Sequence, residues 1–255
     1  MRRGIPIMRR VPLGLLSCVA VIVFWQVLSG RAFVNPALLP PPSRVAPAVW
    51  NIVASGSIIE PLTQTLGLLA VGYGVGCVLA IGLGLLMGFN RHVYNVFEPL
   101  VELLRTIPKP ALVPPLFLFL GIGAATKITI VALAAFFPVL INTVQGVRGV
   151  DPVLLNTART FRRSTLSTIA EVVLPAALPM ILTGMRVSLG LALTLVVLAE
   201  MLIGSTGVGF LILDLQRSFA ITDMLAWVFI LGVIGVSLNA AFETIEHAAV
   251  PWRSK

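Results

Sequence analysis

Residues 62–89 read LTQTLGLLAVGYGVGCVLAIGLGLLMGF and contain no charged side chain. A helix that crosses the hydrocarbon core of a bilayer needs about 20 predominantly apolar residues. This run is longer than that, and it has no polar face that could lie against water. The stretch therefore predicts a membrane-spanning helix.

The composition of the whole chain agrees with this stretch. Of the 255 residues, 58% are hydrophobic and 11% are charged, whereas soluble domains have roughly 45–50% apolar and about 25% charged residues. The net charge of +8 comes from basic residues that lie between apolar runs. That arrangement is typical of membrane orientation signals and not of a nucleic-acid surface. The composition predicts an all-α, polytopic membrane protein.

Five other apolar runs bring the prediction to six transmembrane helices. The first follows a basic start; no A-x-A cleavage site comes after it, so we expect a retained helix and not a signal peptide. Prolines 108, 110, 114 and 115 interrupt the third run. The Pro-rich connector at 30–61 contains an amphipathic stretch, 45–54, that would lie at the membrane interface. The predicted spans are 11–29, 62–89, 96–121, 128–144, 179–203 and 226–242.

The basic residues of the connecting segments are unevenly divided between the two sides of the membrane. Cytoplasmic loops carry the excess of Lys and Arg. The distribution predicts a bacterial plasma-membrane protein with both termini and segment 146–178 in the cytoplasm. One side would hold Arg2, Arg3, Arg9, Arg10, Arg91, Arg148, Arg159, Arg162, Arg163, Arg253 and Lys255, and the other Arg31, Arg44, Lys127 and Arg217.

Small residues recur every fourth position in the second predicted span, at Gly72, Gly76, Ala80, Gly84 and Gly88. Such rows let helix backbones approach closely in lipid, where no hydrophobic effect drives helices together. The row predicts either plain bundle packing, which we favour, or a sliding helix that lines a pathway.

Nothing in the sequence indicates a catalytic centre, a metal site or a resident cofactor. Cys18 and Cys77 lie inside apolar runs, and His92 and His247 are isolated. The nearest match to a P-loop, GIGAATKI at 121–128, lacks the second glycine and the Ser or Thr after the lysine. We therefore expect a chain that is not itself an enzyme.

Segment 146–178 is the longest polar stretch and is helix-prone. Asp151 before Pro152 is a typical N-cap followed by a first-turn proline, and Ser164 is a second candidate N-cap. Two short helices, at about 152–161 and 164–173, would form a hairpin that serves as a connector or as a docking surface for a soluble partner.

This hairpin carries the most specific motif of the chain. The run NTARTF at 156–161, followed by VVLP at 172–175, has the spacing of the EAA loop of ABC importer permeases. LRTIP at 104–108, GIG at 121–123 and AEM at 199–201 also resemble the nitrate/sulfonate/taurine branch of that family. The resemblance covers about residues 60–245.

The motif departs from the family pattern at several positions. The glutamate of the family is Asn156, its first alanine is Thr157, and its glycine is Arg162, which Arg163 follows. An arginine at the glycine position predicts right-handed helical geometry there, or a turn displaced to Ser164.

The resemblance implies a type I (MetI-like) permease fold. It divides the chain into 1–59, a first helix with its periplasmic connector; 60–245, the permease core; and 246–255, a cytoplasmic tail. It also implies a permease dimer, which we expect to be a homodimer, two ATP-binding subunits, and a periplasmic or lipoprotein substrate-binding protein. The residues implied to couple to the ATPase are Asn156, Thr157, Ala158, Arg159, Thr160, Phe161, Arg162, Arg163, Leu174 and Pro175.

Three ionisable residues inside the predicted spans are candidates for a translocation pathway, because charges in a bilayer are expensive. Lys109 lies between two prolines of the broken third span and would attract an anion, or would be interfacial if that span begins later. Arg186 would line the path or snorkel, and Glu200 would belong to an outer gate or be solvated at the interface.

The sequence thus predicts the permease subunit of an ABC importer for a small, anionic solute such as a sulfonate, taurine or nitrate. Two alternatives remain open: uptake of a pyrimidine-type or thiamine-precursor nutrient by the same kind of importer, and a self-contained secondary transporter or channel. The inverted repeat of many secondary transporters is not evident.

Overall fold

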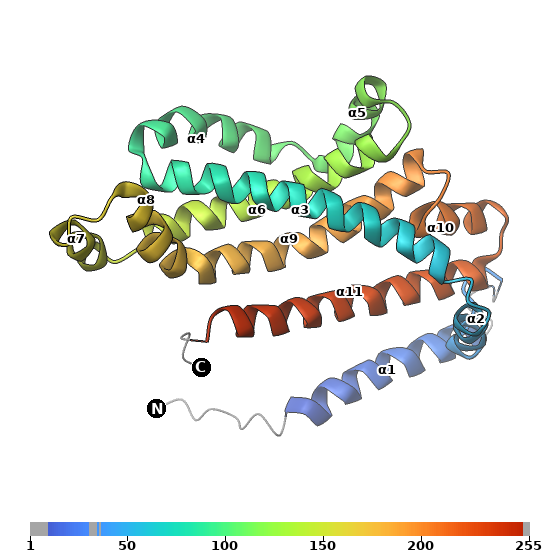
Figure 1. The fold of residues 1–255 in the computed structure, drawn as a ribbon. Coiled ribbons are helices and arrows are strands. Elements are labelled where there is room, and N and C mark those ends of the chain that lie inside the picture. Colours follow the sequence, from blue (N-terminus) through green and yellow to red (C-terminus); the bar gives the residue numbers. More distant parts are fainter. Residues whose placement is uncertain (1–9, 31–34, 36, 252–255) are drawn as a thin grey trace. The chain divides into compact units, whose positions relative to one another are not determined.

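The computed structural model describes residues 10–30, 35 and 37–251, except for the side chains of 10–13, 15 and 30. Within these ranges the chain is helical and has no β-strand (Figure 1). The elements are α1 Arg10–Gly30, α2 Pro42–Ala54, α3 Ile59–Phe89, α4 Arg91–Thr106, η2 Lys109–Leu112, α5 Val113–Leu120, α6 Ala124–Arg148, α7 Pro152–Thr160, α8 Thr165–Thr168, η3 Ile169–Val173, α9 Leu174–Ile203, α10 Val208–Arg217 and α11 Ile221–Ala249.

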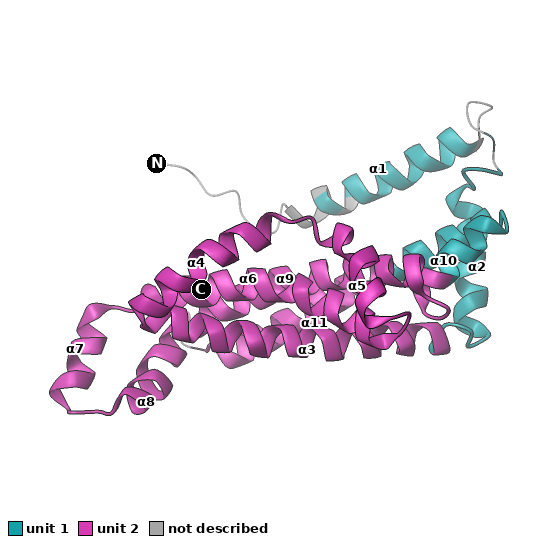
Figure 2. Cartoon of the chain, turned by 90° about the horizontal axis from the view of Figure 1, so that it is seen from above, with its two compact units in different colours: residues 1–59, 211–231 teal, residues 60–210, 232–255 magenta. Residues whose placement is uncertain are grey.

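The chain forms two compact units, shown in different colours in Figure 2. Unit 1 comprises Met1–Ile59 and Leu211–Leu231, and unit 2 comprises Glu60–Phe210 and Gly232–Lys255. The functional division inferred from the sequence, into 1–59, 60–245 and 246–255, stays a prediction.

The predicted all-α membrane fold is confirmed. The described residues contain four candidate spans, or five if a bent helix pair counts as one, which is close to the six predicted. Four helices of the described chain are long and apolar enough to cross a bilayer: Ile59–Phe89, Ala124–Arg148, Thr165–Ile203 and Ile221–Ala249. In α1, which has 21 residues, the described apolar part Leu16–Ser29 is shorter than a span.

The predicted interruption of the third span is confirmed. Arg91–Thr106 and Lys109–Leu120 meet at a bend of 92°. Pro108 and Pro110 explain the break, because proline has no N–H to donate and disfavours helical geometry in the residue before it.

The fifth predicted span, 179–203, lies within a longer helix. A continuous helical run extends from Thr165 to Ile203. Pro175 lies in the first turn of α9, where a missing N–H is tolerated. Just before it, the Leu174 N–H bonds the Ile169 carbonyl in the i to i−5 pattern of a π-helix. Sequence reasoning also missed α10, which lies between the last two long helices.

In unit 2, α6 packs between α3 and α9. Gly76 of α3 lies so close to α6 that a Cβ built on it would be 2.5 Å from the Ala132 carbonyl oxygen. On the other side, Gly184 of α9 contacts Pro138, Val139 and Asn142 of α6. The predicted small-residue row of α3 therefore packs in the bundle, and Tyr73 Oη of the same helix donates a 2.7 Å hydrogen bond to the Met185 carbonyl of α9.

In unit 1, the predicted amphipathic stretch is confirmed as the helix α2. Val45 and Ala48 of α2 are buried against Ala226 near the start of α11. Trp25 of α1 and Ile52 pack around this small core. Apolar contacts thus hold α2 to α1 and to the start of α11.

The close approach of α3 to α6 yields a stability prediction. Gly76→Ala should lower the free energy of unfolding by about 1–3 kcal/mol, because the new methyl group overlaps the backbone of α6. Gly74→Ala is the matched control, since a Cβ at Gly74 meets no atom within 4 Å. Thermal unfolding in detergent measures both variants, and equal melting temperatures would contradict the packing described for Gly76.

Candidate functional site

The hairpin at 146–178 is built from two helices whose starts are capped by side chains. The Asp151 carboxylate accepts a 2.8 Å hydrogen bond from the Val153 N–H. Ser164 Oγ accepts one of 3.2 Å from the Ser167 N–H. Both predicted N-caps are confirmed. Because caps satisfy N–H groups that the helix leaves without partners, each arm of the hairpin begins at a fixed residue.

The turn of the hairpin lies where the sequence motif places the family's glycine. Arg162 has a φ of 51°, in the left-handed region. The Arg162 N–H bonds the Arg159 carbonyl, and the Arg163 N–H bonds the Ala158 carbonyl, which is the Schellman pattern at a helix end. The expectation of right-handed geometry, or of a turn displaced to Ser164, is therefore wrong. The two paired carbonyls hold the arginine in a conformation that suits glycine.

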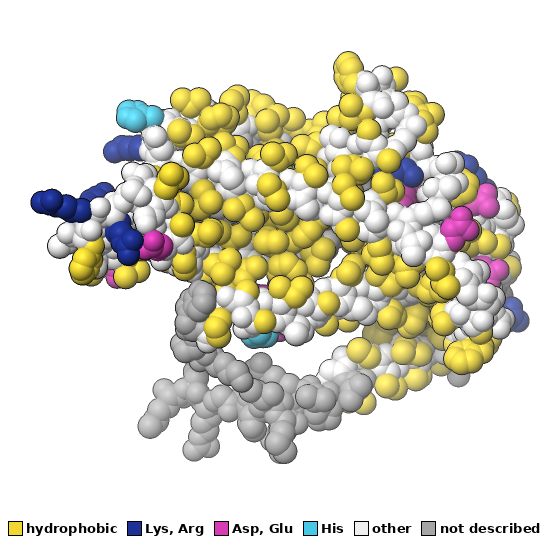
Figure 3. All heavy atoms as spheres, viewed as in Figure 1, with side chains coloured by type: hydrophobic (Ala, Val, Ile, Leu, Met, Phe, Trp, Pro, Cys, Tyr) yellow, Lys and Arg dark blue, Asp and Glu magenta, His cyan; other side chains and the backbone are white. Residues whose placement is uncertain are grey.

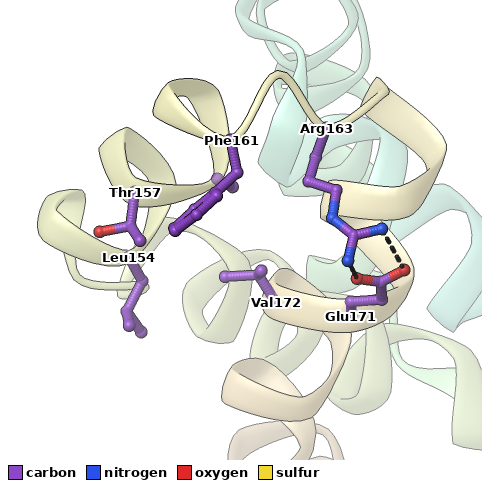
Figure 4. Close-up of a pocket in the computed structure, with 7 residues that line it drawn as sticks. Leu154, Thr157, Phe161, Arg163, Glu171 and Val172 are labelled. Atoms are coloured by element: carbon purple, nitrogen blue, oxygen red, sulfur yellow. Dashed lines mark hydrogen bonds and ion pairs between the residues drawn. The ribbon is translucent and has the colours of Figure 1, made fainter.

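A pocket of about 360 Å³ lies between the arms of the hairpin. Figure 4 shows Phe161 on the first arm and Val172 on the second, with Arg163 and Glu171 joined beside them. The Arg163–Glu171 ion pair measures 3.4 Å, and Ser167 Oγ donates a 2.8 Å hydrogen bond to Glu171. The pocket is lined by Leu154, Thr157, Ala158, Phe161, Arg163, Glu171 and Val172.

The hairpin exposes large apolar side chains next to this pocket. Phe161 is 75% exposed and Leu154 is 46% exposed. Basic side chains gather at the same end of unit 2 in the view of Figure 3. Apolar side chains exposed among charged ones are typical of a protein interaction surface. The arrangement suits the docking of a soluble protein.

Lys109 closes the broken end of α4. Its Nζ donates to the carbonyls of Leu104, Arg105 and Ile107, at 3.1, 2.9 and 2.8 Å. The same ammonium lies 4.4 Å from the ring centroid of Phe137 on α6. An ammonium group has three N–H donors, so all three have carbonyl partners. Lys109 thus acts as a C-terminal cap that satisfies the carbonyls left without partners at the break.

Glu200 lies buried in a polar network that joins α3, α9 and the start of α10. Thr65 Oγ1 lies 2.9 Å from each carboxylate oxygen, so its single hydroxyl proton is shared between them. The Gly209 N–H donates to the carboxylate, and the Val208 N–H donates to Thr65, both at 2.9 Å. Gly207 has a φ of 99°, and a Cβ there would overlap the carboxylate. The buried acid thus fixes the turn that leads into α10.

Arg186 joins α9 to α11 within unit 2. Its Nε donates a 3.2 Å hydrogen bond to Asn239, and its terminal nitrogens lie 3.1 Å from Glu243 and 3.7 Å from Glu246. A pocket of about 220 Å³ adjoins this group on the side of Gly190 and Gly235. The arginine is thus neutralised by two carboxylates of the neighbouring helix.

Comparison with known proteins identifies the family. The profile of the "binding-protein-dependent transport system inner membrane component" family matches residues 80–255. This chain belongs to that family.

Several permeases are similar to it over most of their length. The putative aliphatic sulfonates permease SsuC of Bacillus subtilis (strain 168) is 35% identical over 94% of this chain and 87% of its own. The taurine permease TauC of Escherichia coli (strain K12) is 27% identical, over 98% and 93%. The nitrate import permease NrtB of Synechocystis sp. is 29% identical, over 94% and 90%.

A solved structure shares the fold. The inward-facing MetNI methionine ABC transporter superposes with a TM-score of 0.65 at 19% identity, over 80% of this chain and 98% of the matched chain. The predicted permease fold is therefore confirmed. The protein is a membrane permease of an ABC importer and works with ATP-binding and substrate-binding components.

The structure of the permease gives Lys109, Arg186 and Glu200 three different surroundings, and their roles in a pathway stay predictions. Sequence reasoning missed the partners that hold them: Thr65 for Glu200, and Glu243 with Glu246 for Arg186. The two glutamates were detectable in principle. They lie at i and i+3 just beyond the predicted end of the last span, on the side of the membrane nearer to Arg186 in the fifth.

The turn of the permease hairpin can be tested through Arg162. Arg162→Gly should stabilise the turn by about 1 kcal/mol, because glycine enters the left-handed region without a Cβ clash. Amide hydrogen exchange at residues 158–163 should slow by about fivefold. Arg162→Ala keeps the strain and removes the guanidinium, so it should not slow exchange. Equal slowing in both variants would assign the effect to the lost charge.

The network around Glu200 gives a further prediction. Thr65→Val leaves the Val208 N–H without a partner and leaves the Glu200 carboxylate with the Gly209 N–H as its remaining hydrogen-bond donor among the described residues, and should lower the free energy of unfolding by about 1–3 kcal/mol. Thr63→Val, two residues away, removes an exposed hydroxyl that bonds only the Glu60 carbonyl and serves as the control. Thr65→Ser should restore most of the loss in a detergent melting assay. Equal melting temperatures of Thr65→Val and Thr63→Val would refute the role given to Thr65 in the Glu200 network.

Proposed function

We propose that the hairpin at 146–178 is the surface on which the ATP-binding component docks. The observation that carries this proposal is the exposed apolar pocket between the two capped arms, beside Phe161 and Val172. The coupling residues would be the motif positions Asn156, Thr157, Ala158, Arg159, Thr160, Phe161, Arg162, Arg163, Leu174 and Pro175.

A rigid connection from the hairpin to the membrane supports a coupling role. The second arm continues without a break from Thr165 to Ile203, and the first arm is tied to it by the Arg163–Glu171 ion pair. A displacement of the docked hairpin would therefore move α9 as a lever. Rigid-body movements of this kind underlie many switching transitions.

The hairpin and both termini would lie in the cytoplasm. Eleven Lys and Arg residues lie in the segments assigned to that side, against four in the opposite segments. The permease would act as a homodimer with two ATP-binding subunits, which hold ATP and Mg²⁺, and it would receive solute from the binding protein at the opposite face. The chain itself would not hydrolyse ATP, because its sequence lacks a P-loop.

The solute would be small and anionic. The names of three similar permeases refer to aliphatic sulfonates, taurine and nitrate, each of which carries an anionic group. Arg105 and Lys109 line a pocket of about 350 Å³ with Thr194 and Leu195 of α9. Because the Lys109 N–H donors are bonded to carbonyls, its contribution would be the positive potential of the pocket and not a direct hydrogen bond.

The docking proposal is tested by co-purification with the ATP-binding component of the importer. Phe161→Glu puts a charge into the pocket and should abolish co-purification, as should deletion of 152–173. Leu166→Glu changes a side chain that is equally exposed on the hairpin but does not line the pocket, and it should retain the partner. Size-exclusion profiles check that the variants remain folded.

Two results would overturn the proposal. In the first, Phe161→Glu and Leu166→Glu retain the ATP-binding component equally well. In the second, the purified chain moves solute into liposomes without ATP, which would identify a self-contained carrier or channel.

A further inference from the structure

The helix α2 buries only one of its sides. Val45 and Ala48 face the core of unit 1, with Val49 and Ile52 beside them. These positions lie on one side of a helix with 3.6 residues per turn. The remainder of the helix surface is exposed in unit 1, and its composition differs from that of a helix facing water.

The exposed surface of α2 is mostly apolar. Trp50 is 71% exposed and Val53 is 48% exposed, and Ala46, Pro47 and Ala54 are exposed with them. At 100° per residue these five positions form one continuous surface next to the buried side. Ser43 also lies on this surface, at the first turn of α2, where it bonds Gln26 of α1. The other polar residues form a narrow edge, where Arg44 and Asn51 lie one above the other, seven residues apart.

Contacts of α2 fix its depth relative to the apolar helices of unit 1. Ser43 and Gln26 of α1 exchange two hydrogen bonds, of 3.2 and 3.3 Å. Gln26 lies four residues, or about 6 Å, before the end of α1. On its buried side α2 packs against Ala226, which lies five residues, or about 7.5 Å, inside the start of α11. The helix therefore lies level with the end turns of two apolar helices.

The direction of α2 fits a position along the membrane surface. Figure 1 views α2 nearly end-on while α1 lies in the plane of the picture, so the two helices cross steeply. A helix at this depth and direction lies along the rim of the hydrocarbon core. Water there would leave Trp50 and Val53 unfavourably exposed, whereas lipid would accept them and leave Arg44 and Asn51 at the headgroups. Tryptophan is enriched at this level of membranes.

We propose that α2 is an interfacial helix, whose surface of Ala46, Pro47, Trp50, Val53 and Ala54 inserts into the lipid at the side where α1 ends and α11 begins. The partner of this surface is the bilayer itself. The polar edge of Arg44 and Asn51 faces the headgroups and water, and the inserted surface anchors unit 1 at a fixed depth. The inference does not depend on which side of the membrane is cytoplasmic.

Spin labels on neighbouring positions of α2 test this proposal in proteoliposomes. Single cysteines replace Trp50, Val53, Arg44 or Asn51 in a background in which Cys18 and Cys77 are alanine. At 50 and 53, relaxation by lipid-soluble O2 should exceed relaxation by a water-soluble nickel chelate, and this order should reverse at 44 and 51. Trp50 and Asn51 are adjacent in sequence, so each is the matched control of the other.

Two outcomes would overturn the proposal. If the nickel chelate dominates at all four positions, the helix faces water. If neither reagent reaches 50 and 53, another protein surface, such as a second copy of the chain, covers them.

A second measurement avoids cysteine variants that fail to fold. Trp50→Phe, in the otherwise unchanged permease, should reduce the fraction of tryptophan fluorescence that brominated lipids quench. An unchanged fraction would contradict insertion of Trp50.

Discussion

The backbone of α6 is approached closely from two sides, and the bundle of unit 2 depends on this contact. Gly76 of α3 meets α6 on one side, and Gly184 of α9 meets it on the other. Lipid supplies no hydrophobic drive between helices, so association rests on packing and on hydrogen bonds. Glycine provides the packing, since only a residue without a Cβ allows such an approach. The Tyr73 hydrogen bond to Met185 links α3 directly to α9.

This packing positions the polar groups at the two ends of α9. The run from Thr165 to Ile203 carries the hairpin arm at one end and Glu200 near the other. Between them, Arg186 is held by the carboxylates of α11. Glu200 and Arg186 are thus each matched by polar groups of neighbouring helices, as expected for ionisable groups that must leave water. In the proposed mechanism, a displacement of the hairpin reaches these contacts through one continuous helix.

Local signals in the sequence predicted the hairpin well. Asp151 before Pro152, and Ser164 before its helix, specify helix starts through contacts within a few residues, so no tertiary information was needed. Arg162 shows the limit of that approach. Its left-handed geometry follows from two hydrogen bonds that close the end of α7, and these override the preference of the arginine itself. Lys109 likewise suggested a charge open to solute, whereas the broken helix end takes up its three donors.

The sequence by itself determined the membrane class, the long apolar helices, the small-residue row, the helix caps and the family, because these depend on composition, periodicity and local spacing. Only the tertiary structure decided the 92° bend of the third predicted span, the partners of Glu200 and Arg186, and the uncovered surface of α2. Each of these depends on groups far apart in the chain. Thr65 and Glu200, for example, are separated by 135 residues and meet only because α3 and α9 pack side by side. Burial favours a hydrogen-bond partner for each polar group, and for Glu200 the fold supplies Thr65.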